Sequence, residues 1–120
     1  MRSMTLDWTA GALAEGLACY RSQRFFDAHE HWEDAWRASA EPEKSFLQAL
    51  IHIAAALHHL RRQNPVGAER QLRRALRRLE GYPAEFGGVA VEALRASVRG
   101  WVHCLQAGDP APSLPIPPVR

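Results

Sequence analysis

The chain has 120 residues, of which 47% are apolar and 23% are charged, and its formal net charge is +2. These values describe a single domain with a modest hydrophobic core, and a charge this close to zero gives no general argument for nucleic acid or a membrane as the partner. No apolar run reaches the roughly 18 residues that span a bilayer, and the first residues lack the apolar core of a signal peptide. We therefore expect a cytoplasmic protein in which Cys19 and Cys104 are free thiols.

The first helix is predicted over Asp7–Ser22, where apolar residues recur at spacings of three and four. They are Leu6, Ala10, Leu13, Leu17 and Tyr20. Gly11 and Gly16 each weaken a helix by about 1 kcal/mol relative to alanine, so this helix must be stabilised by packing. Trp8 lies off the apolar face, which suggests a second copy of the chain or another protein as a partner.

The second helix is predicted from Phe25 to about Ser39 and has an apolar arc interrupted by two ionisable residues. The arc contains Phe25, Phe26, Ala28, Trp32 and Trp36. At about 100° per residue, His29 and Glu33 fall inside this arc, one turn apart. A buried ionisable pair must be partnered, because its desolvation costs several kcal/mol. The pair therefore marks the candidate site.

The third helix is predicted to begin in the segment 41–43, where a proline and two glutamates suit a first helical turn, and to reach Arg62. It is apolar on most sides, which is typical of a buried helix. Its narrow polar stripe consists of Gln48, His52, Ala55 and His59. Gln48 and His52 lie in mid-helix, and we expect them to contact the second helix.

The fourth helix is predicted to start at Asn64-Pro65, an N-cap followed by proline, and to end at Glu80. A last helix covers residues 91–105 and ends before Gly108. Five prolines between Asp109 and the C-terminus predict an extended or disordered tail that contributes little to the core. The expected fold is all-α: a compact bundle of about five helices in antiparallel hairpins over residues 1–108, followed by the tail of residues 109–120.

Three stretches carry a family resemblance: residues 25–36, residues 46–52, and Asn64 with Gly67-Ala68. They resemble the family catalogued as domain of unknown function 309, small helical proteins of bacteria and archaea, over roughly residues 13–105. The resemblance implies a compact all-helical fold. It also implies that the following residues match the family's motif: His29, Glu30, Glu33, Trp36 and Gln48. The chain departs from the family pattern at His52, at Ala49 and at Ala90, where glutamine, glycine and a helix-capping aspartate are more usual.

The polar cluster formed by the motif residues and His52 has two interpretations. In the first, His29, Glu33 and Gln48 form a closed hydrogen-bond network that sets the register of the second and third helices. In the second, His29, Glu33 and His52 ligate a metal ion and Glu30 acts as a base, by analogy with the His-Glu-x-x-His helix of zinc peptidases. Glu33 replaces the second histidine of that motif, so we favour the network.

The outward face of the fourth helix carries a stripe of five arginines: Arg70, Arg73, Arg74, Arg77 and Arg78. A basic stripe suits a phosphate-bearing partner, but no aromatic residues are interleaved with it, and Glu69 and Glu80 dilute its charge. We therefore expect a solvated face and not a nucleic-acid-binding surface.

The function predicted from these patterns is that of a non-catalytic binding or interaction module with a buried His–Glu–Gln cluster. The alternatives are a metal-dependent enzyme acting on a small molecule and a nucleic-acid-binding protein. The sequence identifies no cofactor.

Overall fold

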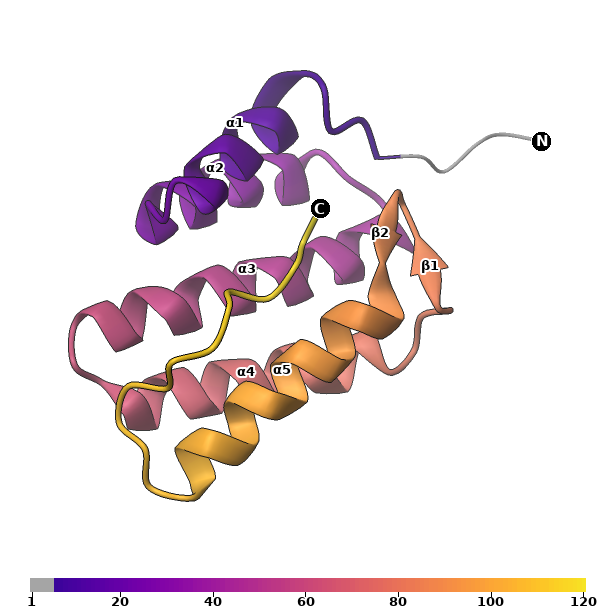
Figure 1. Cartoon of the computed structure of the whole chain (residues 1–120). Helices are drawn as coiled ribbons and strands as arrows, with labels where there is room; N and C mark the ends of the chain where they lie inside the picture. Colours follow the sequence, from indigo (N-terminus) through magenta and orange to yellow (C-terminus); the bar gives the residue numbers. More distant parts are fainter. Residues whose placement is uncertain (1–5) are drawn as a thin grey trace.

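The computed structural model describes residues 6–120, and its described part folds into five helices and one short two-stranded ribbon (Figure 1). The helices are α1 (Gly11–Arg21), α2 (Phe25–Arg37), α3 (Glu43–Arg61), α4 (Pro65–Leu79) and α5 (Val91–Gln106). The all-α prediction is confirmed, although α1 begins at Gly11 and not at Asp7. None of these helices combines the length and the hydropathy that a membrane span requires. The prediction that the N-terminus lacks a signal peptide rests partly on residues 1–5. These residues lie outside the described part of the chain.

Local chemistry explains how the helices are joined. The Asn64 side-chain oxygen accepts a hydrogen bond from the backbone N–H of Gly67 at 3.0 Å, and Pro65 is the first residue of α4, as the sequence predicts. Gln23 and Gln63 adopt left-handed backbone conformations, with φ of 63° and 59°. These two residues lie in the short turns that reverse the chain between α1 and α2 and between α3 and α4.

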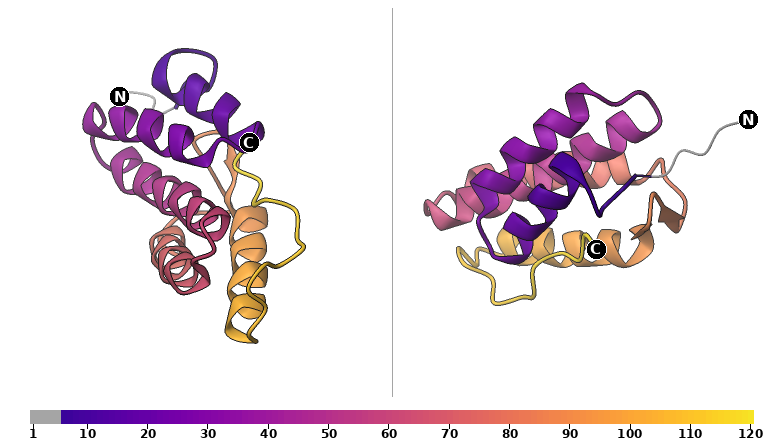
Figure 2. Two further views of the ribbon diagram at one scale, coloured as in Figure 1. Left: turned by 90° about the vertical axis from the view of Figure 1, so that its left-hand side faces the viewer. Right: turned by 90° about the horizontal axis from the view of Figure 1, so that it is seen from above.

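Helices α2, α3 and α4 lie side by side, while α1 packs on α2 and α5 packs on α4 (Figure 2). Central α3 supplies much of the core, and Phe46, Leu47, Leu50 and Ile53 are fully buried. Its polar stripe (Gln48, His52, Ala55 and His59) is only half-buried. One side of α3 is therefore accessible between α2 and α4.

The ribbon consists of β1 (Glu85–Phe86) and β2 (Val89–Ala90), which pair in antiparallel register. Gly87 and Gly88 connect them with φ of 57° and 81°, the positive values that a tight two-residue hairpin requires. Two-residue strands are too short to produce an alternating pattern, so this ribbon was not predicted. Val89 is buried, and the Phe86 ring packs 5.0 Å from that of Phe46.

The tail of residues 109–120 is extended and returns from the end of α5 towards α1 and α2 (Figure 1). Val119 is only 1% exposed, the Tyr20 hydroxyl donates to the Pro117 carbonyl at 2.7 Å, and Trp101 Nε1 donates to the Pro115 carbonyl at 3.0 Å. The expectation that the tail contributes little to the core is therefore wrong. Proline lacks an N–H, but its carbonyl still accepts hydrogen bonds, and here two proline carbonyls receive buried aromatic donors.

Trp8 belongs to the core of its own chain. It is 6% exposed, its Nε1 donates to the Gly87 carbonyl at 2.7 Å, and its ring meets Trp32 edge-on at 6.4 Å. The suggestion that Trp8 contacts a partner is therefore wrong, because the ribbon covers the side of the residue that a single-helix projection leaves open. Cys19 is buried and Cys104 half-buried, and both are free thiols.

Candidate functional site

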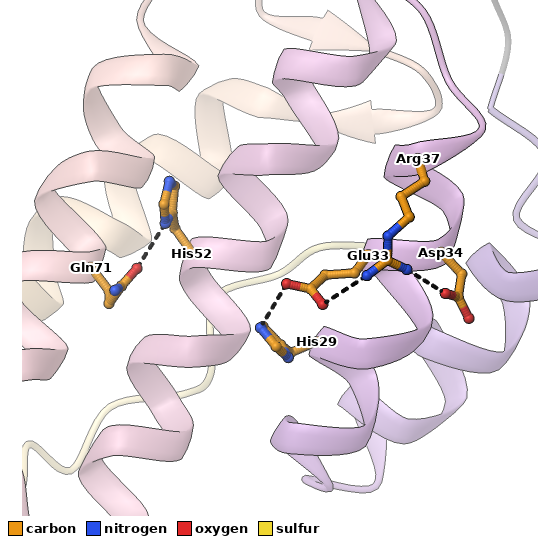
Figure 3. A network of polar contacts seen from close by, with 6 residues as sticks. All are labelled: His29, Glu33, Asp34, Arg37, His52 and Gln71. Atoms are coloured by element: carbon orange, nitrogen blue, oxygen red, sulfur yellow. Dashed lines mark hydrogen bonds and ion pairs between the residues drawn. The ribbon is translucent and has the colours of Figure 1, made fainter.

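The pair that drew attention in the sequence lies on the side of α2 next to α3. His29 Nε2 is 3.2 Å from Glu33 Oε2, and Arg37 bridges Glu33 to Asp34 at 3.8 and 2.8 Å (Figure 3). The His29 and Glu33 side chains are 24% and 38% exposed, so the prediction of a sealed buried pair is wrong. The helices packed against α2 fully cover Ala28 and Trp32 but leave the edge of the apolar arc open. Ion pairs this exposed contribute at most about 1 kcal/mol to stability.

The other predicted cluster residues do not join this pair. Glu30 is exposed, and the half-buried Trp36 ring has Lys44 Nζ 3.9 Å above its centre. His52 lies on the opposite flank of α3, where its Nδ1 is 2.7 Å from the Gln71 side-chain oxygen of α4 (Figure 3). The expected contact of His52 with the second helix is therefore replaced by one with the fourth.

The three candidate metal ligands are consequently divided between two places. His29 and Glu33 lie on one flank of α3, and His52 pairs with an amide on the other. Within residues 6–120, no three histidine, cysteine, aspartate or glutamate side chains are grouped so that they could hold a metal ion. The predicted metal set is not assembled in this structure.

A hollow of about 560 Å³ lies between α3 and α4, and we call it the α3–α4 groove. Its lining residues are Gln48 and His52 from α3 and Arg74, Arg77 and Arg78 from α4. The groove brings together two residues of the predicted polar cluster and three of the predicted basic stripe, which the sequence analysis treated as separate features. The half-buried stripe of α3 is thus one wall of a basic groove.

The arginines of the groove differ from their neighbour Arg73 in their charge balance. Arg73 pairs with Glu69 at 2.8 Å, whereas no carboxylate in the described part of the chain lies within 4.0 Å of the guanidinium nitrogens of Arg74, Arg77 or Arg78. Arg78 affects the pKa of one nearby carboxyl group, that of Glu41. Its pKa is lowered mainly by hydrogen bonds from Ser45, with a smaller contribution from Arg78. The groove therefore keeps positive charge available for a ligand.

The electrostatics of His52 reflect this surrounding charge. Burial lowers the pKa of His52 below its usual value, the hydrogen bond to Gln71 opposes this, and the positive charges of Arg78, Arg74 and Arg77 lower the pKa further. The imidazole is thus held neutral at pH 7. With Nδ1 donating to the Gln71 oxygen, neutral His52 has an acceptor at Nε2.

Two residues of this region were missed by the sequence analysis. Gln71 was not singled out, although it lies three and seven residues before Arg74 and Arg78 and so shares their side of α4. Phe26 was assigned to the apolar arc of the second helix, yet it is 48% exposed. Its place at the edge of that arc, beside His29, was the available signal.

Comparisons with known proteins identify the family. A family model described as "Domain of unknown function (DUF309)" matches residues 13–71. The chain is a member of this family. The resemblance proposed from the sequence is confirmed over residues 13–71, from α1 to Gln71 of α4, whereas its predicted extension to residue 105 lies outside the match. It therefore includes Gln48 and His52, while the three arginines of the groove lie beyond it.

Two relatives of this DUF309 protein are themselves uncharacterised. An uncharacterised protein of Aquifex aeolicus (strain VF5) is 26% identical over 110 residues, which cover 91% of this chain and 33% of the relative. The uncharacterised protein YpuF of Bacillus subtilis (strain 168) is 32% identical over 62 residues, which cover 51% of this chain and 36% of YpuF. The matched segments thus span about a third of the length of each relative.

Proposed function

We propose that this DUF309 protein is a binding module that holds a phosphate-bearing ligand in the α3–α4 groove. The observation that carries the proposal is the set of three arginines, Arg74, Arg77 and Arg78, which line the groove and have no carboxylate partner within the described residues. Guanidinium groups are planar, remain charged at every physiological pH and match phosphate oxygens with two parallel hydrogen bonds.

The α3 side of the groove supports this assignment. Gln48 offers an amide that can donate to a phosphate oxygen, and His52 is fixed by its hydrogen bond to Gln71. A bound anion would offset the positive charge that lowers the pKa of His52 and would favour the protonated ring as a further donor. Every lining residue can therefore contribute either charge or a hydrogen bond to an anion.

The same lining favours binding over chemistry. Its five side chains supply positive charge and hydrogen-bond donors, which hold a phosphate, and the nucleophilic side chains serine, threonine and cysteine are not among them. The His29–Glu33 pair, which could move a proton, lies on the other flank of α3. A binding role is thus the simplest use of the groove.

The proposal predicts saturable binding of inorganic tripolyphosphate, measured by isothermal titration calorimetry at pH 7 and about 50 mM salt, where the electrostatic contribution is large. The double variant R74Q/R77Q should weaken binding by about tenfold or more, because each charge-assisted hydrogen bond contributes about 1.5–3 kcal/mol. Glutamine keeps much of the side-chain length, and both arginines are exposed, so the fold should be retained.

The matched control is R99Q, which removes an exposed arginine from α5, away from the groove. R99Q should bind tripolyphosphate as the wild-type protein does. Absence of saturable binding to the wild-type protein would refute the proposal. Equal losses in R99Q and R74Q/R77Q would also refute it, since they would show a response to overall charge and not to the groove.

A further inference from the structure

An exposed aromatic side chain lies across α3 from the groove. Phe26 of α2 is 48% exposed, and its ring centre is 5.2 Å from that of His58 of α3 and 5.7 Å from that of His29. We call these three residues the Phe26 platform. Most large apolar side chains of the described chain are buried or half-buried. The Phe26 ring is stacked with that of His29 at an interplanar angle of 28°, and its exposed part is available to a ligand.

The surroundings of the Phe26 platform are basic. A hollow of about 300 Å³ adjoins it and is lined by Gln23, Arg24, Phe25, Phe26, Asp27, His58 and Arg61. Asp27 lies 3.6 Å from Arg24. Arg61 hydrogen-bonds to Gln23 and lies over the Phe25 ring at 5.1 Å, so it has an amide and an aromatic ring as neighbours in place of a carboxylate. The pKa of His58 is lowered mainly by burial, with smaller contributions from Arg62, His59 and His29.

The Phe26 platform and the α3–α4 groove are linked by the accessible side of α3. His52 and His58 are six residues apart, which corresponds to about 9 Å along a helix axis. Ala55 lies between them and His59 directly after them, and both are half-buried members of the polar stripe of α3. Two carboxylates of α2 near the platform already have cationic or imidazole partners: Asp27 pairs with Arg24, and Glu33 pairs with His29 and Arg37. A single extended ligand could therefore contact both the Phe26 platform and the α3–α4 groove.

We infer that the ligand is a single-stranded nucleic acid, with its phosphates in the α3–α4 groove and one of its bases stacked on Phe26. This inference rests on the proposed function and names the ligand class. Proteins bind single strands without sequence preference by combining a basic groove for the backbone with aromatic side chains for the bases. The sequence analysis counted the lack of aromatics on the fourth helix against nucleic acid, and the fold supplies one from α2.

The choice of a single strand follows from the chemistry of Phe26. In a duplex the base faces are covered by their neighbours, so one exposed ring has no base face to contact. A simple polyphosphate would fill the groove and leave Phe26 unused. A strand with accessible bases uses both the positive charge and the exposed ring.

The test is fluorescence anisotropy at about 50 mM salt with labelled strands of about ten nucleotides, a length within the range that small domains cover. The probes are oligouridylate, oligodeoxythymidylate and an abasic strand of equal charge. F26A should weaken binding of the base-bearing strands by about fivefold to a hundredfold, following the cost of losing one stacked base. It should leave the abasic strand and tripolyphosphate unaffected, whereas R74Q/R77Q should weaken binding of all four probes.

Controls separate stacking from damage to the fold. F26W keeps an aromatic face and should bind the base-bearing strands at least as well as the wild-type protein. V66A truncates another exposed apolar residue, which is 66% exposed on α4, and should have no effect. Thermal melts of F26A and F26W would verify that both remain folded under the binding conditions.

The outcomes distinguish this inference from the proposed function. If F26A and the wild-type protein bind the base-bearing strands equally, or if the abasic strand binds as tightly as the base-bearing strands, the inference is wrong. Tripolyphosphate binding that depends on Arg74 and Arg77 would then still support the proposed function. Failure of every probe would contradict both.

Discussion

Removal of residues 111–120 should lower the thermal midpoint by at least about 10 °C. The truncation exposes the pocket of Val119, whose burial contributes about 1.5–3 kcal/mol. It also removes the acceptor of the Tyr20 hydroxyl, and a buried donor without a partner costs about 1–3 kcal/mol. Burial raises the pKa of Tyr20, so the hydroxyl remains a donor at any pH used for the measurement. The expected loss of about 3–5 kcal/mol corresponds to this shift in a domain of this size.

A matched pair of substitutions isolates the contribution of the tail. V119A should lower the midpoint measured by circular dichroism, whereas V66A, the same change at a 66% exposed position, should leave it nearly unchanged. A truncated protein that melts within about 2 °C of the full chain would show that the tail does not dock as described.

Gly16→Ala should destabilise the protein by about 1–2 kcal/mol, the difference between the overpacking cost and the helix-propensity gain, although alanine is the better helix former. A Cβ at Gly16 would overlap the indole ring of Trp32, which is completely buried. Overpacking of a filled core costs about 1–3 kcal/mol and occasionally more. The gain of about 1 kcal/mol in helix propensity cannot offset a clash with a ring that has no room to move. Urea denaturation monitored by tryptophan fluorescence measures the difference.

Gly100→Ala is the control for this prediction. Gly100 lies within α5, and a Cβ there would meet Leu114 Cδ1 at 3.9 Å, an ordinary contact. This variant should be as stable as the wild-type protein or up to about 1 kcal/mol more stable. Equal and favourable effects of alanine at both positions would contradict the described packing of α1 on α2.

Features of the fold that depend on residues close together in the chain were predictable from the sequence. The start of α4 was found because the Asn64 cap and Pro65 act within a single turn. The docking of the tail was not found, since the Tyr20–Pro117 hydrogen bond joins residues 97 positions apart and no local pattern encodes it. Gly16 was interpreted as a weak point of a helix, whereas it is the position where Trp32 approaches the α1 backbone.

The candidate site was predictable in its parts but not in its assembly. Helical spacing correctly joined His29 to Glu33, because residues four apart share a face. It could not tell how far the neighbouring helices cover that face, so the pair was expected to be buried. The pairing of His52 with Gln71 depends on how α3 and α4 are placed side by side, and this placement converts two separate sequence features into one groove.

The most direct test of the central claim is the titration of His52 by NMR, with and without tripolyphosphate. In the free protein the ring should titrate below the usual histidine range, because burial and the arginines of the groove lower its pKa. An anion in the α3–α4 groove favours the protonated ring, so the account predicts that tripolyphosphate raises the pKa of His52 while the exposed His103 of α5 is unaffected. A His52 titration that does not change at saturating tripolyphosphate would contradict binding in the groove.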